Sequence, residues 1–367
     1  MLLKSKEAMS LSASAYDRML AGGWFRGARF MNKPDYICVE GDLFSPVHIR
    51  LELDNHEPRN SHKRRLKINN KRFTCDIRPA SVDSDLEALY QNQKSDFQAF
   101  IYPRLDEAIL CSENLFSFRT YCLRVFDDTR LVAASFFDIG RNSMASLLGL
   151  YDKDYSKYSL GTYTMLREID LAKQIGLNFY YPGYVLDDMR IFGYKLGLGE
   201  MKFKDVSGRW SDLAKYNRVK SKSIIYKNKF NQFVEWLNKR GIKGKTRVYP
   251  LHYAYNPHLE QSQFYRYPLF YEVYINDERF AASYDPEKDT FVWSQLCTSP
   301  FYERLLMGLE MSIDLKETPD YEVSLLECRN EIHLPCFMLN SDQNANSMPT
   351  GQWSDPITSL KMKASLK

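Results

Sequence analysis

The chain has 367 residues, of which 44% are hydrophobic and 26% charged, as is typical of a folded globular protein. No run approaches the roughly 20 apolar residues of a membrane span, and the N-terminus lacks the apolar core of a signal peptide. We therefore expect a cytoplasmic protein of two or three domains with no membrane partner.

The periodicity of apolar residues predicts an α+β chain. Up to residue 139 it predicts a loose leader or short helix over Met1–Ala15, a helical start in Tyr16–Phe30 that breaks at Gly22-Gly23, a strand over Pro46–Leu53, a helix over Asp83–Phe100, and a hairpin of Phe116–Phe126 and Leu131–Ile139. After residue 195 it predicts a flexible Leu196–Gly199, one or two basic helices over Asp212–Arg240, a linker over Gly241–Lys245, a meander of Phe270–Ile275, Arg279–Tyr284 and Thr290–Trp293, a helix near Tyr302–Ile313, and a strand near Tyr321–Cys328.

Two stretches are strongly basic although the net charge is only +4. Arg59–Arg78 contains a single acid, and Lys202–Arg247 interleaves Lys and Arg with aromatic residues. Such stretches suit a phosphate backbone and unstacked bases, whereas a solvated helix face is the alternative. For the segment of the first stretch that contains Lys63, Arg64 and Arg65, the alternative is a capped basic turn.

The stretch Asp138–Lys195 organises the chain. An apolar strand over Met144–Tyr151 is followed by a charged loop over Asp152–Tyr158 and then by a helix. The apolar residues of this helix share one face, and Glu168 is expected on the opposite face as an ion-pair partner. Gly176 stands where a helix C-cap is expected, and Phe179–Val185 is predicted as the next strand.

The helix begins at Ser159-Leu160-Gly161-Thr162. Because a helix N-terminus has unpaired N–H groups and a partial positive charge, it binds phosphate and other anions. Gly161 lets a ligand approach the backbone, and Ser159 or Thr162 adds a hydroxyl donor. The alternative is an ordinary N-cap by Ser159 or Thr162 with nothing bound. The glycine spacing excludes a P-loop and a Rossmann fingerprint.

An ordered set of motifs in this stretch resembles the C-terminal domain of the arginyl-tRNA–protein transferases, a family that includes bacterial aspartate/glutamate leucyltransferases. The motifs are Asp138-Ile139, Tyr151–Asp154, Ser159–Tyr163, Arg167–Ile169, Tyr181–Tyr184 and Tyr194-Lys195. A thinner resemblance extends over Tyr16–Asp212. Where the family usually carries a cysteine cluster this chain has only Cys38, so we predict no metal site. The altered run Met189–Lys195 leaves acceptor specificity open.

The resemblance implies an α+β fold with an acetyltransferase-like (GNAT) mixed-sheet core, an N-terminal basic region and an extra C-terminal α+β region. It places an N-terminal aminoacyltransferase-like region at residues 1–80 and the GNAT-like catalytic domain at residues 81–240. A C-terminal α+β appendage is expected at residues 241–339, where it binds the acceptor or packs on the core, followed by a disordered tail at residues 340–367.

The resemblance also implies a reaction: arginine or leucine moves from charged tRNA to the α-amino group of acceptor proteins with N-terminal Asp or Glu, as in the N-degron pathway. The partners are aminoacyl-tRNA and these acceptors. No cofactor is expected, because the ester is already activated and charged tRNA is a co-substrate. Two alternatives stay open: an acyl-CoA-dependent N-acetyltransferase on the same fold, and an inactive tRNA-binding adaptor.

In the implied fold two central strands splay and leave a cleft at the start of the following helix. Asp138 and Asp152 are candidates for the base or for holding the amine, with loop capping as the alternative for Asp152. Tyr181 and Tyr184 stack on the terminal adenosine or donate to the carbonyl, unless they only pack across strands. The candidates for binding tRNA or the aminoacyl group are Ser159, Leu160, Gly161, Thr162, Tyr163, Lys195, Lys63, Arg64 and Arg65. Lys195 contacts a phosphate or the acceptor's acidic side chain, or is solvated.

Overall fold

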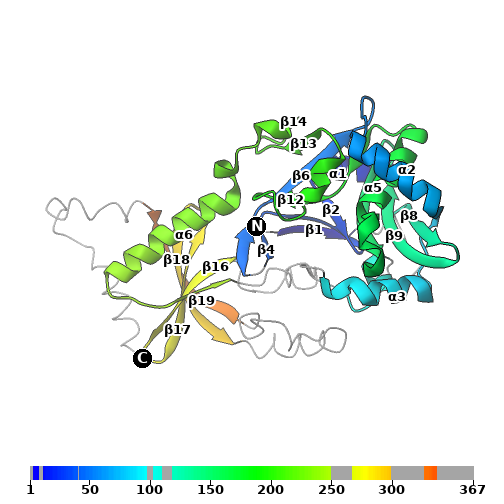
Figure 1. Cartoon of the computed structure of the whole chain (residues 1–367). Coiled ribbons are helices and arrows are strands. Elements are labelled where there is room, and N and C mark those ends of the chain that lie inside the picture. The colour runs from blue at the N-terminus through cyan, green and yellow to red at the C-terminus, as the bar shows by residue number, and fades with distance from the viewer. Residues whose placement is uncertain are drawn as a thin grey trace. The chain divides into compact units, whose positions relative to one another are not determined.

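The computed structural model of the chain describes residues 3–7, 11–39, 41–96, 102–109, 118–248, 267–298 and 326–336 (Figure 1). The chain divides into a larger unit, Leu3–Glu40 and Phe44–Ser221, and a C-terminal unit, Gly41–Leu43 and Lys222–Lys367 with Met1–Leu2. Both contain helices and sheets, so the predicted α+β class is confirmed. The domain boundaries at residues 80, 240 and 339 stay predictions. The expected helix at 302–313 and the tail lie outside the described residues.

The helices in the described residues before Ser221 are α1 (Ala13–Ala21), α2 (Asn60–Arg72), α3 (Ser84–Gln93), α4 (Leu105–Ile109) and α5 (Leu160–Gln174), with the short 3-10 helices η1 (Lys94–Asp96), η2 (Lys153–Tyr158), η3 (Gly193–Leu198), η4 (Leu213–Lys215) and η5 (Arg218–Lys220). The strands there are β1 (Leu3–Glu7), β2 (Phe25–Gly27), β3 (Phe30–Pro34), β4 (Ile37–Val39), β5 (Asp42–Phe44), β6 (Pro46–Glu52), β7 (Thr74–Pro79), β8 (Thr120–Asp127), β9 (Arg130–Ile139), β10 (Ser143–Tyr151), β11 (Phe179–Tyr181), β12 (Tyr184–Leu186), β13 (Met201–Lys204) and β14 (Trp210–Asp212).

One large sheet dominates the larger unit, with the strand order β14-β13-β6-β11-β10-β9-β8-β7. Neighbouring strands are antiparallel except β10 and β11, which run parallel over Ser143–Ala145. β12 also pairs with β6, beyond the end of β11. The predicted hairpin is confirmed as β8 and β9, and the strands predicted at 46–53 and 144–151 are β6 and β10.

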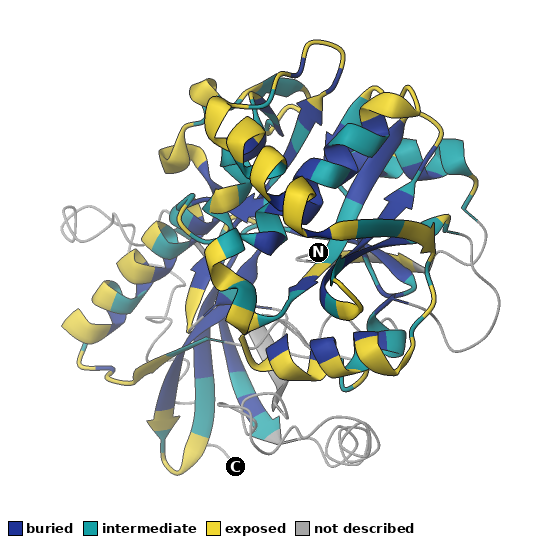
Figure 2. Ribbon diagram, turned by 45° about the vertical axis from the view of Figure 1, so that its right-hand side comes forward, coloured by how far each residue is buried: buried dark blue, intermediate teal, exposed yellow. Residues whose placement is uncertain are grey.

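Helices cover both faces of this sheet. Phe137 of β9 packs in the cluster that contains Leu166 and Ile169 of α5, whereas Phe136 packs with Leu86 of α3 on the opposite face. Side chains alternate across a strand, so two covered faces require apolar residues at consecutive positions. β9 accordingly buries seven residues in a row, and Figure 2 shows buried residues along the central strands.

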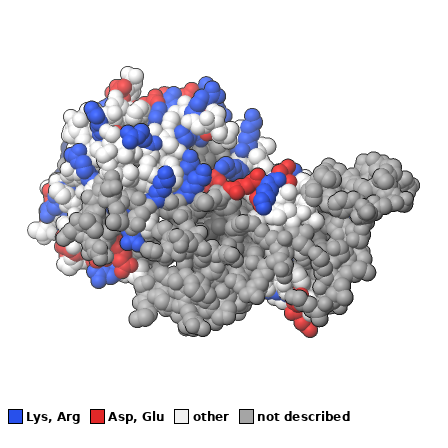
Figure 3. All heavy atoms as spheres, turned by 180° about the vertical axis from the view of Figure 1, so that it is seen from behind, with Lys and Arg blue, Asp and Glu red and all other residues white. Residues whose placement is uncertain are grey.

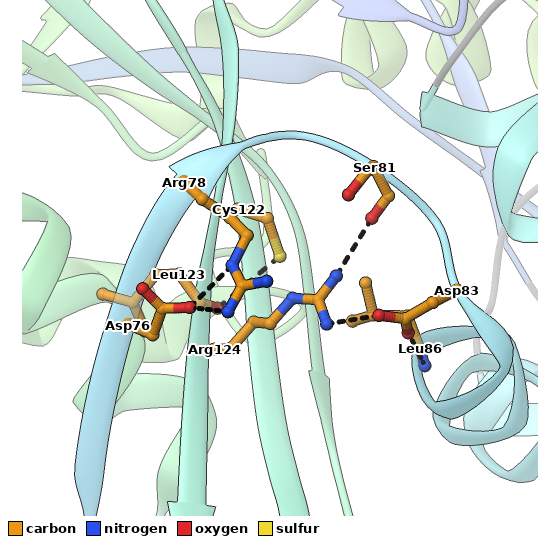
Figure 4. Close-up of polar contacts among 8 residues, drawn as sticks. All are labelled: Asp76, Arg78, Ser81, Asp83, Leu86, Cys122, Leu123 and Arg124. Atoms are coloured by element: carbon orange, nitrogen blue, oxygen red, sulfur yellow. Dashed lines mark hydrogen bonds and ion pairs between the residues drawn. The ribbon is translucent and has the colours of Figure 1, made fainter.

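The start of α3 is fixed to the sheet by a buried arginine (Figure 4). Arg124 of β8 donates to the Asp83 carboxylate at 2.5 Å and to the Ser81 carbonyl at 3.2 Å. Asp83 also accepts from the Leu86 N–H at 3.1 Å, which makes it the N-cap of α3. The helix predicted over Asp83–Phe100 is therefore confirmed at its start, and it gives way to η1 after Gln93.

The C-terminal unit combines α6 (Lys222–Lys239) with an antiparallel sheet of order β15-β16-β17-β18-β19. Its strands are β15 (Lys245–Val248), β16 (Leu269–Ile275), β17 (Glu278–Asp285), β18 (Thr290–Thr298) and β19 (Leu326–Pro335). The residues that α6 buries recur at helical spacing: Ser223, Tyr226, Phe230, Phe233 and Leu237. The predicted meander is confirmed as β16, β17 and β18.

Four local predictions were wrong. The strand expected over 179–185 is broken at Pro182-Gly183, where Gly183 has φ +92°. Residues 196–198 of the stretch predicted to be flexible belong to η3 and bury Leu198, so the stretch is not a flexible connection. The basic helix begins ten residues later than Asp212, at Lys222. β1 pairs with β3 in the segment expected to be a loose leader or short helix.

Aromatic residues of the basic stretch 202–247 belong mostly to hydrophobic cores. Phe203, Tyr226 and Phe230 are each at most 8% exposed. A ring that is packed on all sides has no face on which a base can stack. The interpretation of these three rings as a nucleic-acid surface was therefore wrong.

Candidate functional site

A cavity of about 650 Å³ opens in the larger unit where two neighbouring strands part. β10 and β11 pair only from Ser143↔Phe179 to Ala145↔Tyr181, after which the second strand is interrupted and continues as β12 beside β6. A bulge in β10 near Leu147 adds to the separation. Residues 146–149 of β10 form one wall of the cavity, and residues 181–184 form the wall opposite.

The N-terminus of α5 closes one end of this cavity. Ser159, Leu160, Gly161 and Thr162 all line it. Ser159 has a left-handed backbone (φ +52°), and no side chain caps the helix. The ordinary N-cap considered above is therefore absent, and the first N–H groups of α5 have no intrahelical acceptor. These donors and the positive end of a fifteen-residue helix form an anion-binding feature on the cavity wall.

The opposite wall carries Tyr181, Tyr184 and Lys195. The Lys195 Nζ donates to the Tyr184 carbonyl at 3.0 Å and lies 4.9 Å from the centre of the Phe192 ring. No Asp or Glu in the described ranges pairs with it, and burial lowers its pKa to about 8. A Cβ at Gly183 would lie 3.2 Å from this Nζ, so the left-handed glycine leaves room for the ammonium group. This wall presents a cation to the cavity.

The two tyrosines on this wall have different surroundings. Tyr181 is buried, and its ring lies edge-on to Trp210 at 5.8 Å. Tyr184 packs against Phe25 at 4.9 Å and Phe192 at 5.7 Å, and burial raises the pKa of its phenol to about 12. A phenol with this pKa keeps its proton at neutral pH and acts there as a hydrogen-bond donor.

Glu168 lies behind the cavity wall, although the sequence pattern predicted it on the outer face of the helix. Glu168 of α5 is fully buried, and its Oε2 accepts from the Tyr180 hydroxyl at 2.7 Å. Its other oxygen, Oε1, has no hydrogen-bond partner in the described part of the chain. Burial raises the pKa of this carboxyl to about 7. The prediction of an exposed ion-pair partner was wrong.

Asp138 and Asp152 do not line the cavity. Asp138 is fully buried and accepts from Tyr16 at 2.9 Å, from Thr120 at 2.6 Å and from Arg26 at 2.8 Å. It therefore ties α1 and β2 to the sheet. Asp152 accepts from Arg130 at 2.5 Å and from the Asp154 N–H at 3.0 Å, which is the loop-capping alternative. The structure brings neither carboxylate to the cluster around Lys195.

Tyr163 and the basic residues of α2 also lie away from the cavity lining. Tyr163 points to the other side of α5, where its hydroxyl donates to Asn70 at 2.7 Å. Lys63, Arg64 and Arg65 lie on the N-terminal half of α2, and Lys63 pairs with Glu57 at 3.1 Å. The C-terminal half of α2 is nearer the start of α5, because Asn69 donates to the Tyr158 carbonyl at 3.0 Å. The alternative of a capped basic turn is wrong, because the segment is a helix, whereas contact with tRNA phosphates stays a prediction.

Several residues that the sequence did not indicate also surround the cavity. The hydroxyl residues Ser135 and Ser146 line it from β9 and β10, and His48 lines it from β6. Burial, followed by the charges of Lys33 and Lys204, lowers the pKa of His48 to about 3, so its ring is neutral. Lys157 lies on η2 beside the lining residue Ser156, with its Nζ 5.2 Å from the Tyr158 ring centre. A lone Ser or Lys in a strand or loop gives no local signal of such a position.

On the face drawn in Figure 3, the basic side chains of the described residues do not gather in one patch. Figure 3 shows Lys and Arg spread over the described surface seen from behind, with Asp and Glu between them. Among the described residues, no cluster of three or more His, Cys, Asp or Glu is arranged to hold a metal ion. None of the described helices is long and apolar enough to cross a membrane.

The segment that contains most of this site is similar to a known protein family. The match to the family "Arginine-tRNA-protein transferase, C terminus" covers residues 79–204, which include β10, α5, β11, β12 and Lys195. Over these residues the chain is similar to that family, and the resemblance predicted from the sequence is confirmed.

The relatives are bacterial enzymes named aspartate/glutamate leucyltransferase. One from Helicobacter hepaticus is 29% identical over 194 residues, which are 51% of this chain and 77% of the relative. One from Shewanella oneidensis is 29% identical over 192 residues, 51% of this chain and 76% of the relative. One from Leptospira interrogans is 28% identical over 151 residues, 40% of this chain, and the chain spans 58% of its length. The solved structure of L-PGS from Bacillus licheniformis has 11% identity, covers 39% of this chain and 46% of that chain, and has a TM-score of 0.29.

Proposed function

We propose that this chain transfers an aminoacyl group, leucine or arginine, from charged tRNA to the α-amino group of proteins that begin with Asp or Glu. The observation that carries the proposal is the uncapped N-terminus of α5, which opens on the cavity within the segment that matches the family. The relatives named aspartate/glutamate leucyltransferase support the same reaction. We further propose that the core is acetyltransferase-like, which the parting of β10 and β11 supports.

In this proposal the 3′ end of the tRNA enters along η2. The free N–H groups at the start of α5 bind its terminal phosphate, since a helix N-terminus favours an anion. Lys157 and the basic residues of α2 contact phosphates farther along the acceptor stem. The protonated Tyr184 hydroxyl donates to the ester carbonyl as negative charge develops on its oxygen.

The cation on the opposite wall selects the acceptor. Lys195 has no acidic partner among the described residues, so the side-chain carboxylate of an N-terminal Asp or Glu can pair with it. This pairing brings the adjacent α-amino group toward the ester held at α5, which supplies the proximity that aminolysis needs. Because the ester is already activated, we propose that the reaction needs no cofactor besides charged tRNA. We also propose that it takes place in the cytoplasm, where charged tRNA occurs.

The proposal is tested by incubating the purified chain with radiolabelled Leu-tRNA or Arg-tRNA and a peptide that begins with Asp. A matched peptide that begins with Asn differs by one charge and is expected to receive no label. Lack of tRNA-dependent label with both donors would refute the proposal. Salt-sensitive tRNA binding without product would identify an adaptor, and transfer from acetyl-CoA would identify an N-acetyltransferase.

A further inference from the structure

The buried carboxyl group of Glu168 lies near a serine that lines the cavity. Glu168 itself is 0% exposed and does not line the cavity. Ser146 does line it, and its hydroxyl is close enough to lower the pKa of both Glu168 and Tyr180, against the larger effect of burial, which raises them. Thr164, one turn before Glu168 on α5, lines the same cavity. Only the cavity wall therefore separates this carboxyl group from the space in which the amine and ester meet.

The hydrogen bonding of Glu168 is incomplete. Tyr180 satisfies Oε2, whereas Oε1 and the nearby Ser135 hydroxyl oxygen have no hydrogen-bond partner in the described ranges. A buried polar atom without a partner costs stability, so its retention calls for an explanation outside packing. An open acceptor position beside a cavity is what a proton-accepting group requires.

We propose that Glu168 accepts the proton that the acceptor's ammonium group must lose before attack, and that the Ser146 hydroxyl relays this proton from the cavity. This inference rests on the proposed function. Loss of one proton from R–NH₃⁺ leaves a neutral amine, whose nitrogen forms a bond to the ester carbon. The bond from that carbon to the ribose oxygen then breaks. The nitrogen loses a second proton, the leaving oxygen takes one up, and the products are an amide and a tRNA with a free hydroxyl.

The electrostatic surroundings suit this task. Burial raises the pKa of Glu168 to about 7, against smaller opposing effects of the hydroxyls of Ser135 on β9, Tyr180 on β11 and Ser146 on β10. Burial, followed by the charge of Glu168, raises the pKa of Tyr194 on η3. No Lys, Arg or other acid is among the groups that set the Glu168 pKa. A base with a pKa near the working pH is efficient because much of it is unprotonated and it still binds a proton firmly.

The test is the pH dependence of transfer to an Asp-peptide with saturating charged tRNA. For the wild-type chain the rate is expected to rise through about pH 7, as Glu168 loses its proton. Glu168→Gln keeps the size and the Tyr180 contact, and should lower kcat by about 100-fold or more with KM for tRNA changed less than about twofold. Its profile should retain only the ionisation of the acceptor amine, near pH 8. Ser146→Ala should lower kcat in the same way although Glu168 itself is kept.

Glu200→Gln is the matched control, because Glu200 is exposed and should tolerate the change. A Glu168→Gln chain with near wild-type kcat and an unchanged profile would overturn the inference while leaving the proposed function intact. If Glu168→Gln does not fold, a wild-type profile without an inflection near pH 7, or a fully active Ser146→Ala chain, would overturn it. A wild-type chain that transfers nothing from either tRNA would overturn both.

Discussion

Glu168→Gln should make the protein more stable at alkaline pH, whatever it does to activity. The ordinary pKa of a glutamate, 4.5, describes the unfolded chain, whereas burial raises the pKa in the folded chain to about 7. A group whose pKa is raised on folding imposes no penalty below pH 4.5, where both states are protonated. As pH rises toward 7, the unfolded state gains stability by ionising while the folded state does not.

The size of this effect follows from the two pKa values. At 1.36 kcal/mol per pK unit, the span from 4.5 to about 7 costs the folded wild-type chain about 3 kcal/mol above pH 7. At about pH 5 the cost is still below about 1 kcal/mol. Because Gln does not ionise, the stability gained by Glu168→Gln should grow by about 2.5 kcal/mol between about pH 5 and pH 8.5.

The assay is urea unfolding of the full wild-type and variant chains at both pH values, followed by tryptophan fluorescence. Effects of pH on all other groups cancel in the difference between the two chains. The exposed Glu200→Gln control should show no such growth. A gain for Glu168→Gln that is the same at both pH values would mean that the carboxyl group ionises normally, and the reasoning would be refuted.

Three further substitutions test the walls of the cavity and the buried pair behind it. Gly161→Ala should be at least as stable as wild type, because its Cβ would lie at an ordinary contact distance of 3.7 Å from Tyr151. It should slow transfer about tenfold, because the added methyl group crowds the start of α5. Equal transfer rates would contradict this prediction. Lys195→Met should raise KM for an Asp-peptide about tenfold and leave KM for charged tRNA unchanged. In the wild-type chain, KM for the peptide should increase when the pH exceeds about 8, because Lys195 then loses its proton. Asp138→Asn should lower the free energy of unfolding by about 3 kcal/mol, because it breaks the buried ion pair with Arg26. The kcat per folded molecule should stay within about threefold of wild type. A loss of kcat without a loss of stability would instead support Asp138 as the base.

Local sequence patterns were sufficient to predict those strands and helices whose apolar residues recur at one regular spacing. The alternation of apolar and polar residues in 46–53 and the turn between β8 and β9 are local signals. The strand β6 and the hairpin of β8 and β9 formed as these signals predicted. The insertion of β6 between β11 and β13 depends on pairing of residues more than 100 positions apart, which no local pattern reports. The break at Pro182-Gly183 did have a signal, because proline donates no ladder hydrogen bond and Gly183 adopts a left-handed φ.

The candidate site was predicted in part. The helix start at 159–162, both tyrosines and Lys195 meet around one cavity, and these residues were identified through the family motifs. Glu168 was misplaced because its charge assigned it to the outer face of the helix, whereas it is buried against the sheet, where the Tyr180 hydroxyl of β11 donates to it. The burial of Asp138 had no local signal, because its partners Tyr16 and Arg26 are more than 100 residues away in sequence.

The central claim is that the charged end of tRNA lies at the start of α5. The most direct measurement is photo-crosslinking from a reactive group on the 3′-terminal nucleotide of Leu-tRNA or Arg-tRNA, with the crosslinked residues mapped by mass spectrometry. We predict crosslinks to 159–162 and to 181–184, the two cavity walls. Crosslinks confined to residues after 221, or unaffected by an excess of unlabelled charged tRNA, would contradict the account.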